Sequence, residues 1–129
     1  MLRVQRKIYP WIERAVLDSG RLRLADEKLR TNFSRVIFVC TGNICRSPYA
    51  EAMARSHGLD AISCGIATRT GLPADPTALE EAAAKGVDMS SHRTTRWEDV
   101  ELKSGDLVIA LELRHARAVL PKAKPRIAR

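Results

Sequence analysis

One stretch of this sequence decides the fold: it reads VIFVCTGNICRSP and occupies residues 36–48. Its first four residues are apolar and mostly β-branched, which is typical of a buried strand. Gly42 and Asn43 follow, and these are the residue types that adopt a positive φ most easily. Ser47 and Pro48 favour a helix start, with the serine as N-cap and the proline in the first turn. The stretch predicts a strand, a tight loop and a helix N-terminus, an arrangement that presents several backbone N–H groups to one anion.

The side chains of this loop suit an attack of sulfur on a phosphate ester. A thiolate at Cys40 would lie where loop N–H groups and the helix dipole favour negative charge. Arg46 follows six residues later and offers a planar guanidinium that matches two phosphate oxygens. A nucleophile, an oxyanion cradle and a bidentate cation are what such a reaction needs. The Cys-x5-Arg spacing alone is weak support in a chain with 22 lysine and arginine residues, so the flanking sequence has to support the hypothesis.

Residues 36–115 resemble the low-molecular-weight protein tyrosine phosphatases, especially the bacterial ones. The first matching motif, residues 39–48, is highly specific. Weaker matches follow in family order: Ala50-Glu51, Ser63-Cys64-Gly65, residues 71–76, Gly86-Val87-Asp88, Ser91-His92-Arg93 and residues 106–110. The resemblance implies an α/β fold and the hydrolysis of phosphotyrosine through a phosphocysteine.

The same resemblance implies roles for the residues of the loop. Cys40 would be the nucleophile, and Arg46 would bind the phosphate and stabilise the transition state. The rest of the phosphate-binding loop would be Thr41, Gly42, Asn43, Ile44, Cys45 and Ser47. Ser47 would also help the thiolate to leave when water hydrolyses the intermediate.

Two further implications concern the support and the protection of the loop. Asn43 would hold the loop in a strained conformation, with hydrogen bonds from Ser47, Ser63 and His92. The alternative for His92 is an ordinary polar side chain with no role in the loop. Cys45 resembles the neighbouring thiol that traps an oxidised Cys40 as a disulfide, and its alternative is a small apolar residue at the helix entry.

The sequence departs from the family pattern near its end. Family members carry a general-acid aspartate in an Asp-Pro loop well beyond the helix that is expected to end near Pro121, whereas this sequence ends at Arg129. The one Asp-Pro pair, Asp75-Pro76, matches a helix start in the family and is not expected to be the acid. Either the sequence is cut short or it belongs to a naturally short paralogue. A missing acid would slow the reaction most for poor leaving groups.

Two regions are expected along the chain. Residues 1–33 form an N-terminal helical extension, with apolar residues on one helical face at Ile8, Trp11, Ile12, Ala15 and Val16. This face is expected to pack on the domain or on a second subunit, and binding to a membrane surface is the alternative. Residues 34–129 form a phosphatase-like domain that lacks the usual C-terminal strand, acid loop and helix.

The pattern within this domain is an alternation of strands and helices. Helices are expected at residues 48–57, 76–85 and 113–120, with Gly86 as the stop of the second one. Further strands are expected at 61–63 and 107–111. Such an alternation predicts an open parallel sheet with helices on both faces. The phosphate-binding loop after the first core strand then lies where open α/β sheets bind their ligands.

Composition excludes several classes of protein. The net charge of +7 resides in the two ends of the chain, without the interleaved aromatic residues that stack nucleic-acid bases, so no nucleic-acid partner is expected. Three cysteines give no disulfide framework, and the histidines lack zinc spacing. No apolar run reaches 18 residues. We therefore expect a cytoplasmic protein with no metal, no cofactor and no membrane partner.

Three functions remain open. The first is hydrolysis of phosphotyrosine in a protein substrate, such as a bacterial tyrosine kinase, with inorganic phosphate as the product. The second is a phosphate-binding or regulatory module with weakened catalysis. The third is arsenate reductase, which shares this loop but needs resolving cysteines downstream, and the sequence has none after Cys64. A homodimer through the N-terminal extension is a further prediction.

Overall fold

The computed structural model of the chain describes residues 33–123. Its elements are β1 (Arg35–Cys40), α4 (Arg46–Ser56), β2 (Ala61–Gly65), α5 (Pro76–Ala84), the short 3-10 helix η2 (Trp97–Asp99), β3 (Asp106–Ala110) and α6 (Leu113–Ala123). None of the helices in this part of the chain is long and apolar enough to cross a membrane. The predicted N-terminal extension lies outside the described residues, apart from Phe33.

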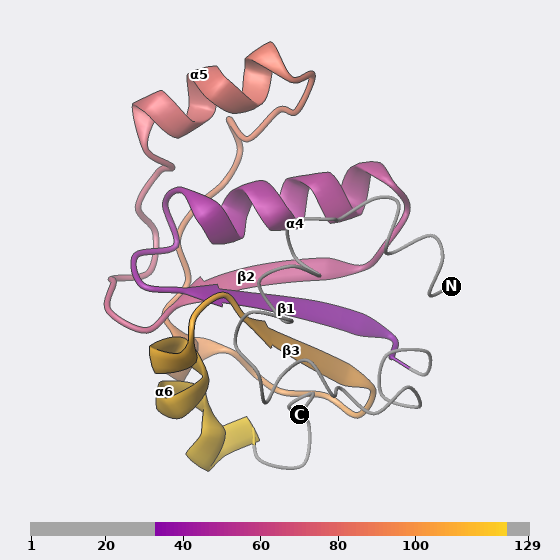
Figure 1. Cartoon of the computed structure of the whole chain (residues 1–129), viewed down its shortest axis with the longest axis vertical. Coiled ribbons are helices and arrows are strands. Elements are labelled where there is room, and N and C mark those ends of the chain that lie inside the picture. The colour runs from indigo at the N-terminus through magenta and orange to yellow at the C-terminus, as the bar shows by residue number, and fades with distance from the viewer. Residues whose placement is uncertain (1–32, 124–129) are drawn as a thin grey trace.

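The sheet has β1 at its centre, with β2 on one side and β3 on the other (Figure 1). Both neighbours pair with β1 in parallel. Residues 36–40 of β1 are all buried, as expected for a central parallel strand whose two faces are both covered. The carboxyl ends of the three strands meet at one edge, where the chain leaves β1 for α4. This confirms the predicted open parallel sheet with its loop after the first core strand.

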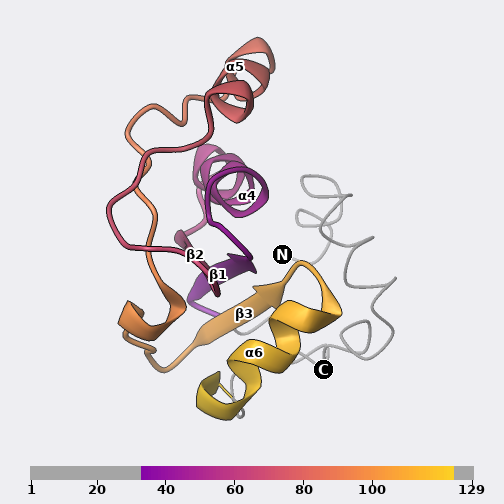
Figure 2. The same ribbon diagram turned by 90° about the vertical axis from the view of Figure 1, so that its left-hand side faces the viewer.

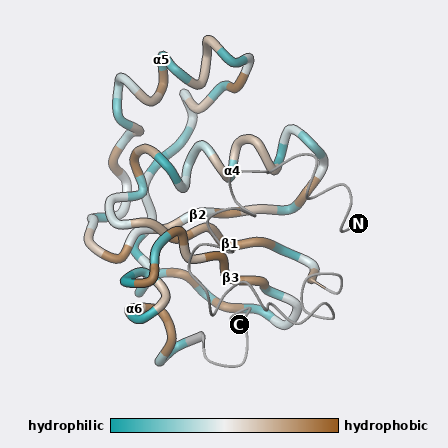
Figure 3. Tube along the Cα trace, in the orientation of Figure 1, coloured by the Kyte–Doolittle hydropathy of each residue, from teal (hydrophilic) through white to brown (hydrophobic). Residues whose placement is uncertain are grey.

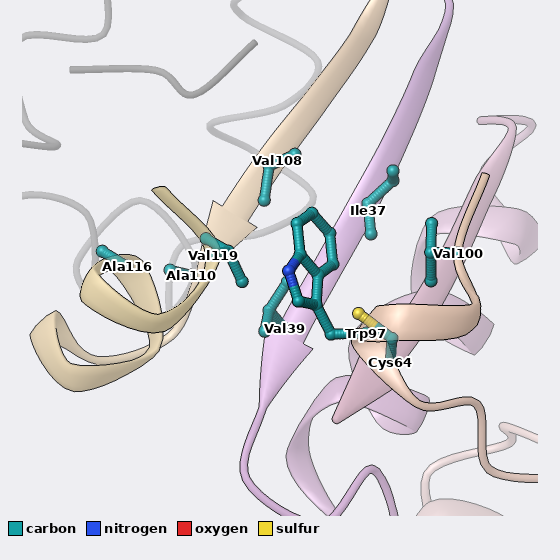
Figure 4. Packing of buried hydrophobic residues seen from close by; sticks show 9 residues of the cluster. All are labelled: Ile37, Val39, Cys64, Trp97, Val100, Val108, Ala110, Ala116 and Val119. Carbon is teal, nitrogen blue, oxygen red and sulfur yellow. The ribbon is translucent and has the colours of Figure 1, made fainter. Parts of the chain in front are cut away.

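The side chains of β1 alternate between two separate cores. Ile37 and Val39 contribute to the core that lies under α6 and η2, together with the indole of Trp97 (Figure 4). Val36 and Phe38 contribute to the core under α4, which supplies two fully buried alanines. Figure 2 shows α4 and α6 on opposite faces of the sheet. The period-2 alternation of strand side chains therefore accounts for helices on both faces, as predicted.

Helix α5 forms a further layer on the outer side of α4 (Figures 1 and 2). Its start is set by Asp75, whose carboxylate accepts a hydrogen bond from the backbone N–H of Ala78, with Pro76 in the first turn. Gly86 follows its end with a φ of 78°, as predicted for a residue after a helix. Figure 3 shows apolar residues concentrated in the strands, whereas polar and apolar residues alternate along α5.

The predicted start of α4 is wrong by two residues. The helix begins at Arg46, so that Cys45 occupies the N-cap position and no side chain caps the helix. Ser47 lies in the first turn instead, and its hydroxyl contacts the sulfur of Cys40 at 2.8 Å. The sulfur of Cys40 has therefore taken the hydroxyl that the local pattern assigned to the cap.

The predicted end of α6 is also wrong. The helix continues to Ala123 and contains Pro121, although a proline inside a helix removes one backbone hydrogen bond. The adjacent Lys122 anchors this last turn. Its ammonium donates to the carbonyl oxygens of Trp97 and Val100 at 2.8 and 2.6 Å, and it lies 4.6 Å from the centre of the Trp97 ring. These tertiary contacts offset the local preference of proline to end a helix.

Candidate active site

The loop between β1 and α4 curls around the sulfur of Cys40. Asn43 has a φ of 56°, and among the described residues it is the only non-glycine residue with a positive φ. Asparagine tolerates this conformation better than most residues. The backbone N–H of Asn43 consequently points into the loop and donates to Cys40 Sγ at 3.2 Å.

A neighbouring segment fixes the loop from outside. The backbone N–H groups of Ile66 and Ala67 donate to the carbonyl oxygens of Cys40 and Thr41 at 3.0 and 2.9 Å. This approach requires a glycine at position 65, because a Cβ there would lie 2.7 Å from the carbonyl oxygen of Thr41. The glycine that ends β2 thus has a role in holding the loop.

Asn43 is also the centre of a buried hydrogen-bond network. Its Oδ1 accepts from the backbone N–H of Thr95 at 2.9 Å, which sets the orientation of the amide. Its Nδ2 then donates to the hydroxyls of Ser47 and Ser63, both at 2.8 Å. The Nε2 of His92 contacts the carbonyl oxygen of Asn43 at 2.8 Å. The structure thus brings together the residues that the sequence proposed as supports of the loop.

This network has a direction, because the Nδ2 of Asn43 can only donate. Both serine oxygens therefore accept from it, and each hydroxyl proton is left for another partner. The hydroxyl of Ser63 donates to Glu51 Oε1 at 2.8 Å. The hydroxyl of Ser47, which is fully buried, lies 2.8 Å from Cys40 Sγ. The hydroxyl proton of Ser47 has two acceptors within reach, Cys40 Sγ at 2.8 Å and the carbonyl oxygen of Cys64 at 3.5 Å. The shorter contact directs this proton to the sulfur.

Arg46 lies at the rim of the loop, in the first turn of α4. Its Nη1 donates to Glu112 Oε1 at 2.8 Å, and the same carboxylate receives the Nε of Arg114 at 2.6 Å. The hydrogen bond from Arg46, followed by that from Arg114, holds the pKa of Glu112 below its usual value of 4.5. Glu112 is therefore ionised at neutral pH and holds one edge of the Arg46 guanidinium.

The three cysteines of the described part are all free and differ in environment. Partial burial, and then the Asp75 carboxylate, raise the pKa of Cys45. Burial raises the pKa of Cys64 to about 12, so this side chain is a core residue facing Trp97 (Figure 4). Both groups therefore remain thiols at neutral pH. The proposed role of Cys45 as a redox partner of Cys40 stays a prediction.

Sequence reasoning missed four contributors to this site: Glu51, Thr95, Glu112 and His115. Glu112 had a usable signal, because it directly follows the strand predicted at 107–111 and strand ends meet at the same edge of the sheet. Thr95 had none, since it contributes a backbone N–H from an irregular segment. Within residues 33–123 no group of three or more His, Cys, Asp or Glu side chains is arranged to hold a metal ion.

The sequence profile of a known family, described as "Low molecular weight phosphotyrosine protein phosphatase", matches residues 35–129. The chain belongs to this family. The match begins at the first residue of β1 and includes the loop, α4 and every later element of the described fold. Family membership agrees with the resemblance found in the sequence.

Individual members are similar over most of the described part. The "Probable low molecular weight protein-tyrosine-phosphatase EpsP" of Ralstonia nicotianae is 40% identical over 79 residues, which are 60% of this chain and 54% of the relative. The chain thus spans little more than half the length of that curated relative. A low molecular weight protein tyrosine phosphatase from T. tengcongensis has a crystal structure with 39% identity and a TM-score of 0.60, over 72% of this chain and 70% of that one.

A second solved structure extends the comparison to a protein named for a different phosphorylated side chain. The YwlE arginine phosphatase from Geobacillus stearothermophilus matches with 30% identity and a TM-score of 0.62, over 73% of this chain and 64% of that one. The fold of this chain is therefore found in proteins named for two different phosphorylated side chains.

Proposed function

We propose that this protein hydrolyses phosphotyrosine in proteins through a phosphocysteine on Cys40. The observation that carries the proposal is the buried Asn43–Ser47 pair, which orients a hydroxyl proton toward Cys40 Sγ at 2.8 Å. A structural cysteine has no need of a buried donor aimed at its sulfur. A nucleophilic cysteine does, because the thiolate is the reactive form.

The reaction has two steps, and the loop serves both. The Cys40 thiolate attacks phosphorus, so that an S–P bond forms while the bond from phosphorus to the tyrosine oxygen breaks. The tyrosine leaves as a phenolate and takes its proton from solvent. Water then attacks phosphorus, releasing inorganic phosphate and the thiolate, and Ser47 stabilises the sulfur as it leaves. Arg46 and the loop N–H groups bind the phosphoryl oxygens, on which charge is spread in the transition state.

The physiological substrate is proposed from the family. We infer that the substrate is a tyrosine-phosphorylated protein, with a bacterial tyrosine kinase as one example. We also infer a cytoplasmic location, because the sequence has no apolar run of 18 residues and no disulfide framework. The loop needs no metal for this chemistry, because the cations and N–H groups that bind phosphate belong to the chain.

Hydrolysis of p-nitrophenyl phosphate in the presence of a chelator tests the proposal. This leaving group is good, so turnover depends little on acid catalysis. We expect activity in the wild-type chain, none in Cys40→Ser, and near wild-type activity in Cys64→Ala, which alters a cysteine buried in the core. Wild-type turnover by Cys40→Ser would exclude Cys40 as the nucleophile. Phosphate binding without turnover in the wild type would support a phosphate-binding module instead.

A second candidate substrate is phosphoarginine, which the similarity to YwlE favours. The two substrates differ in the bond that breaks, P–O in phosphotyrosine and P–N in phosphoarginine. Comparing kcat/KM for a phosphotyrosyl and a phosphoarginyl peptide of otherwise identical sequence decides between them. We expect a higher kcat/KM for the phosphotyrosyl peptide. A higher kcat/KM for the phosphoarginyl peptide would show that phosphoarginine is the better substrate and would contradict the proposed function.

A further inference from the structure

A histidine on α6 is fully buried beside the phosphate-binding loop. His115 has 0% of its surface exposed, although it belongs to a helix whose neighbouring residues Arg114 and Arg117 are exposed. Its Nε2 lies 2.9 Å from the hydroxyl oxygen of Thr41, the residue that follows Cys40. Its Nδ1 lies 3.1 Å from the backbone nitrogen of Glu112. Both ring nitrogens are therefore engaged, one by the loop and one by the turn between β3 and α6.

These contacts determine the tautomer of the ring. The backbone N–H of Glu112 can only donate, so Nδ1 must present its lone pair, and the proton of the neutral ring resides on Nε2. Nε2–H then donates to the Thr41 hydroxyl. Burial lowers the pKa of His115, which Glu112 raises and the Arg46 and Arg114 guanidinium groups lower further. The ring is thus held neutral, with its single proton directed at the loop.

The same turn holds the other end of the loop. The backbone N–H of Glu112 donates to Nδ1 of His115, and the Glu112 carboxylate accepts a hydrogen bond from Nη1 of Arg46 at 2.8 Å. Among the described residues, Nε and Nη2 of Arg46 have no hydrogen-bond partner. One edge of the guanidinium is therefore fixed by Glu112, and the other remains for two oxygens of a phosphate.

We propose that His115 is a positioning residue for the phosphate-binding loop. Together with the turn at Glu112, it joins Thr41, near the start of the loop, to Arg46, near its end. The proposal rests on the proposed function, because the consequence of this joining is the geometry in which phosphate is bound. The sequence separations are 74 residues for the contact of His115 with Thr41 and 66 for that of Glu112 with Arg46. The sheet edge brings these segments together.

Two substitutions separate the two contacts of the ring. In His115→Asn, the amide oxygen can take the place of Nδ1 and keep the Glu112 contact, but nothing reaches Thr41. In His115→Gln, the longer amide can place its nitrogen near Thr41 and lose the Glu112 contact. We expect each variant to raise the inhibition constant for inorganic phosphate about tenfold, the effect of losing one well-formed hydrogen bond. The control is Val119→Ala, which creates a cavity at a fully buried position of the same helix. It should lower Tm but leave the inhibition constant for phosphate within about twofold of the wild-type value.

A double substitution tests whether Thr41 is the target. Thr41→Val removes the hydroxyl, so combining it with His115→Asn should add nothing to phosphate inhibition, whereas combining it with His115→Gln should add its full effect. Nitrogen-15 NMR of the wild type gives an independent readout, and we expect Nε2–H with Nδ1 unprotonated, persisting below pH 6.5.

Three outcomes would overturn the proposal. The first is a His115 ring that carries its proton on Nδ1, and the second is titration of that ring at an ordinary histidine pKa. The third is that the His115 variants have the same inhibition constant for phosphate as Val119→Ala. A wild type that neither binds phosphate nor turns over p-nitrophenyl phosphate would instead overturn the proposed function, whereas the NMR result would still test the position of the ring.

Discussion

Asn43→Ala is expected to destabilise the protein by about 4 kcal/mol, and the structure divides this cost into two parts. The asparagine side chain makes three hydrogen bonds with buried or partly buried groups, at 2.8, 2.8 and 2.9 Å. Each is worth about 1 kcal/mol net, so their loss accounts for about 3 kcal/mol. An alanine at a φ of 56° adds about 1 kcal/mol of backbone strain. The sum is a large share of the roughly 5–15 kcal/mol that stabilises a typical domain.

Two further variants measure these parts separately. Asn43→Gly removes the side chain but adopts positive φ without strain, so it should cost about 1 kcal/mol less than Asn43→Ala. Ser63→Ala removes the hydrogen bond from Asn43 and the one to Glu51, and should cost about 2 kcal/mol. Urea unfolding of the full chain, followed by circular dichroism at neutral pH, gives all three values from the transition midpoints.

The reasoning is refuted if Asn43→Ala unfolds within about 1 kcal/mol of the wild type, since the network would then not stabilise the loop. Equal destabilisation of the glycine and alanine variants would refute the second part, because the positive φ would then carry no cost. A glycine variant more stable than Ser63→Ala would show that the three hydrogen bonds are not independent of one another.

Three other predictions concern the surroundings of the loop. Glu112→Gln should lower the urea midpoint slightly at neutral pH. Because the folded-state pKa of Glu112 is depressed, its contribution to stability is present above about pH 4.5 and is lost as the pH falls through that lowered pKa. The midpoints of the wild type and the variant should therefore converge in acid, and a constant difference would contradict the ion pair with Arg46. Lys122→Met should cost about 1–2 kcal/mol, measured by urea unfolding, through the loss of two carbonyl contacts and a ring contact. Mild peroxide should convert Cys40 to a sulfenic acid that condenses with the Cys45 thiol, releasing water, and mass spectrometry should find the resulting disulfide. After addition of thiol, Cys45→Ala should recover a smaller fraction of its own starting rate than the wild type does. Equal recovery in the two proteins would contradict a protective role of Cys45.

The parts of this protein that could be predicted from the sequence are those with local causes. These are the apolar run of β1, the positive φ of Asn43, and the Asp75 and Gly86 ends of α5, which each depend on residues a few positions apart. The pattern predicts a positive φ for Gly42 as readily as for Asn43, but Gly42 does not adopt one. The errors at the helix ends come from side-chain partners that the local sequence pattern does not specify. Ser47 left its expected cap for Cys40 and Asn43, and Pro121 is tolerated because Lys122 binds carbonyls more than twenty positions earlier.

Local stability and site chemistry compete at the start of α4. A serine at the N-cap is worth about 1 kcal/mol to a helix, yet this helix begins at Arg46 and its N-cap residue, Cys45, makes no side-chain cap. The hydroxyl that could have capped it lies against the Cys40 sulfur instead, and the N–H groups of the first turn are not taken by a side-chain cap. The helix is held by its packing, through Ala50 and Ala54, which are fully buried against the sheet. Because tertiary packing stabilises α4, its N-terminus can be left to bind an anion, and the same dipole that a cap would have satisfied then favours a phosphate at the loop.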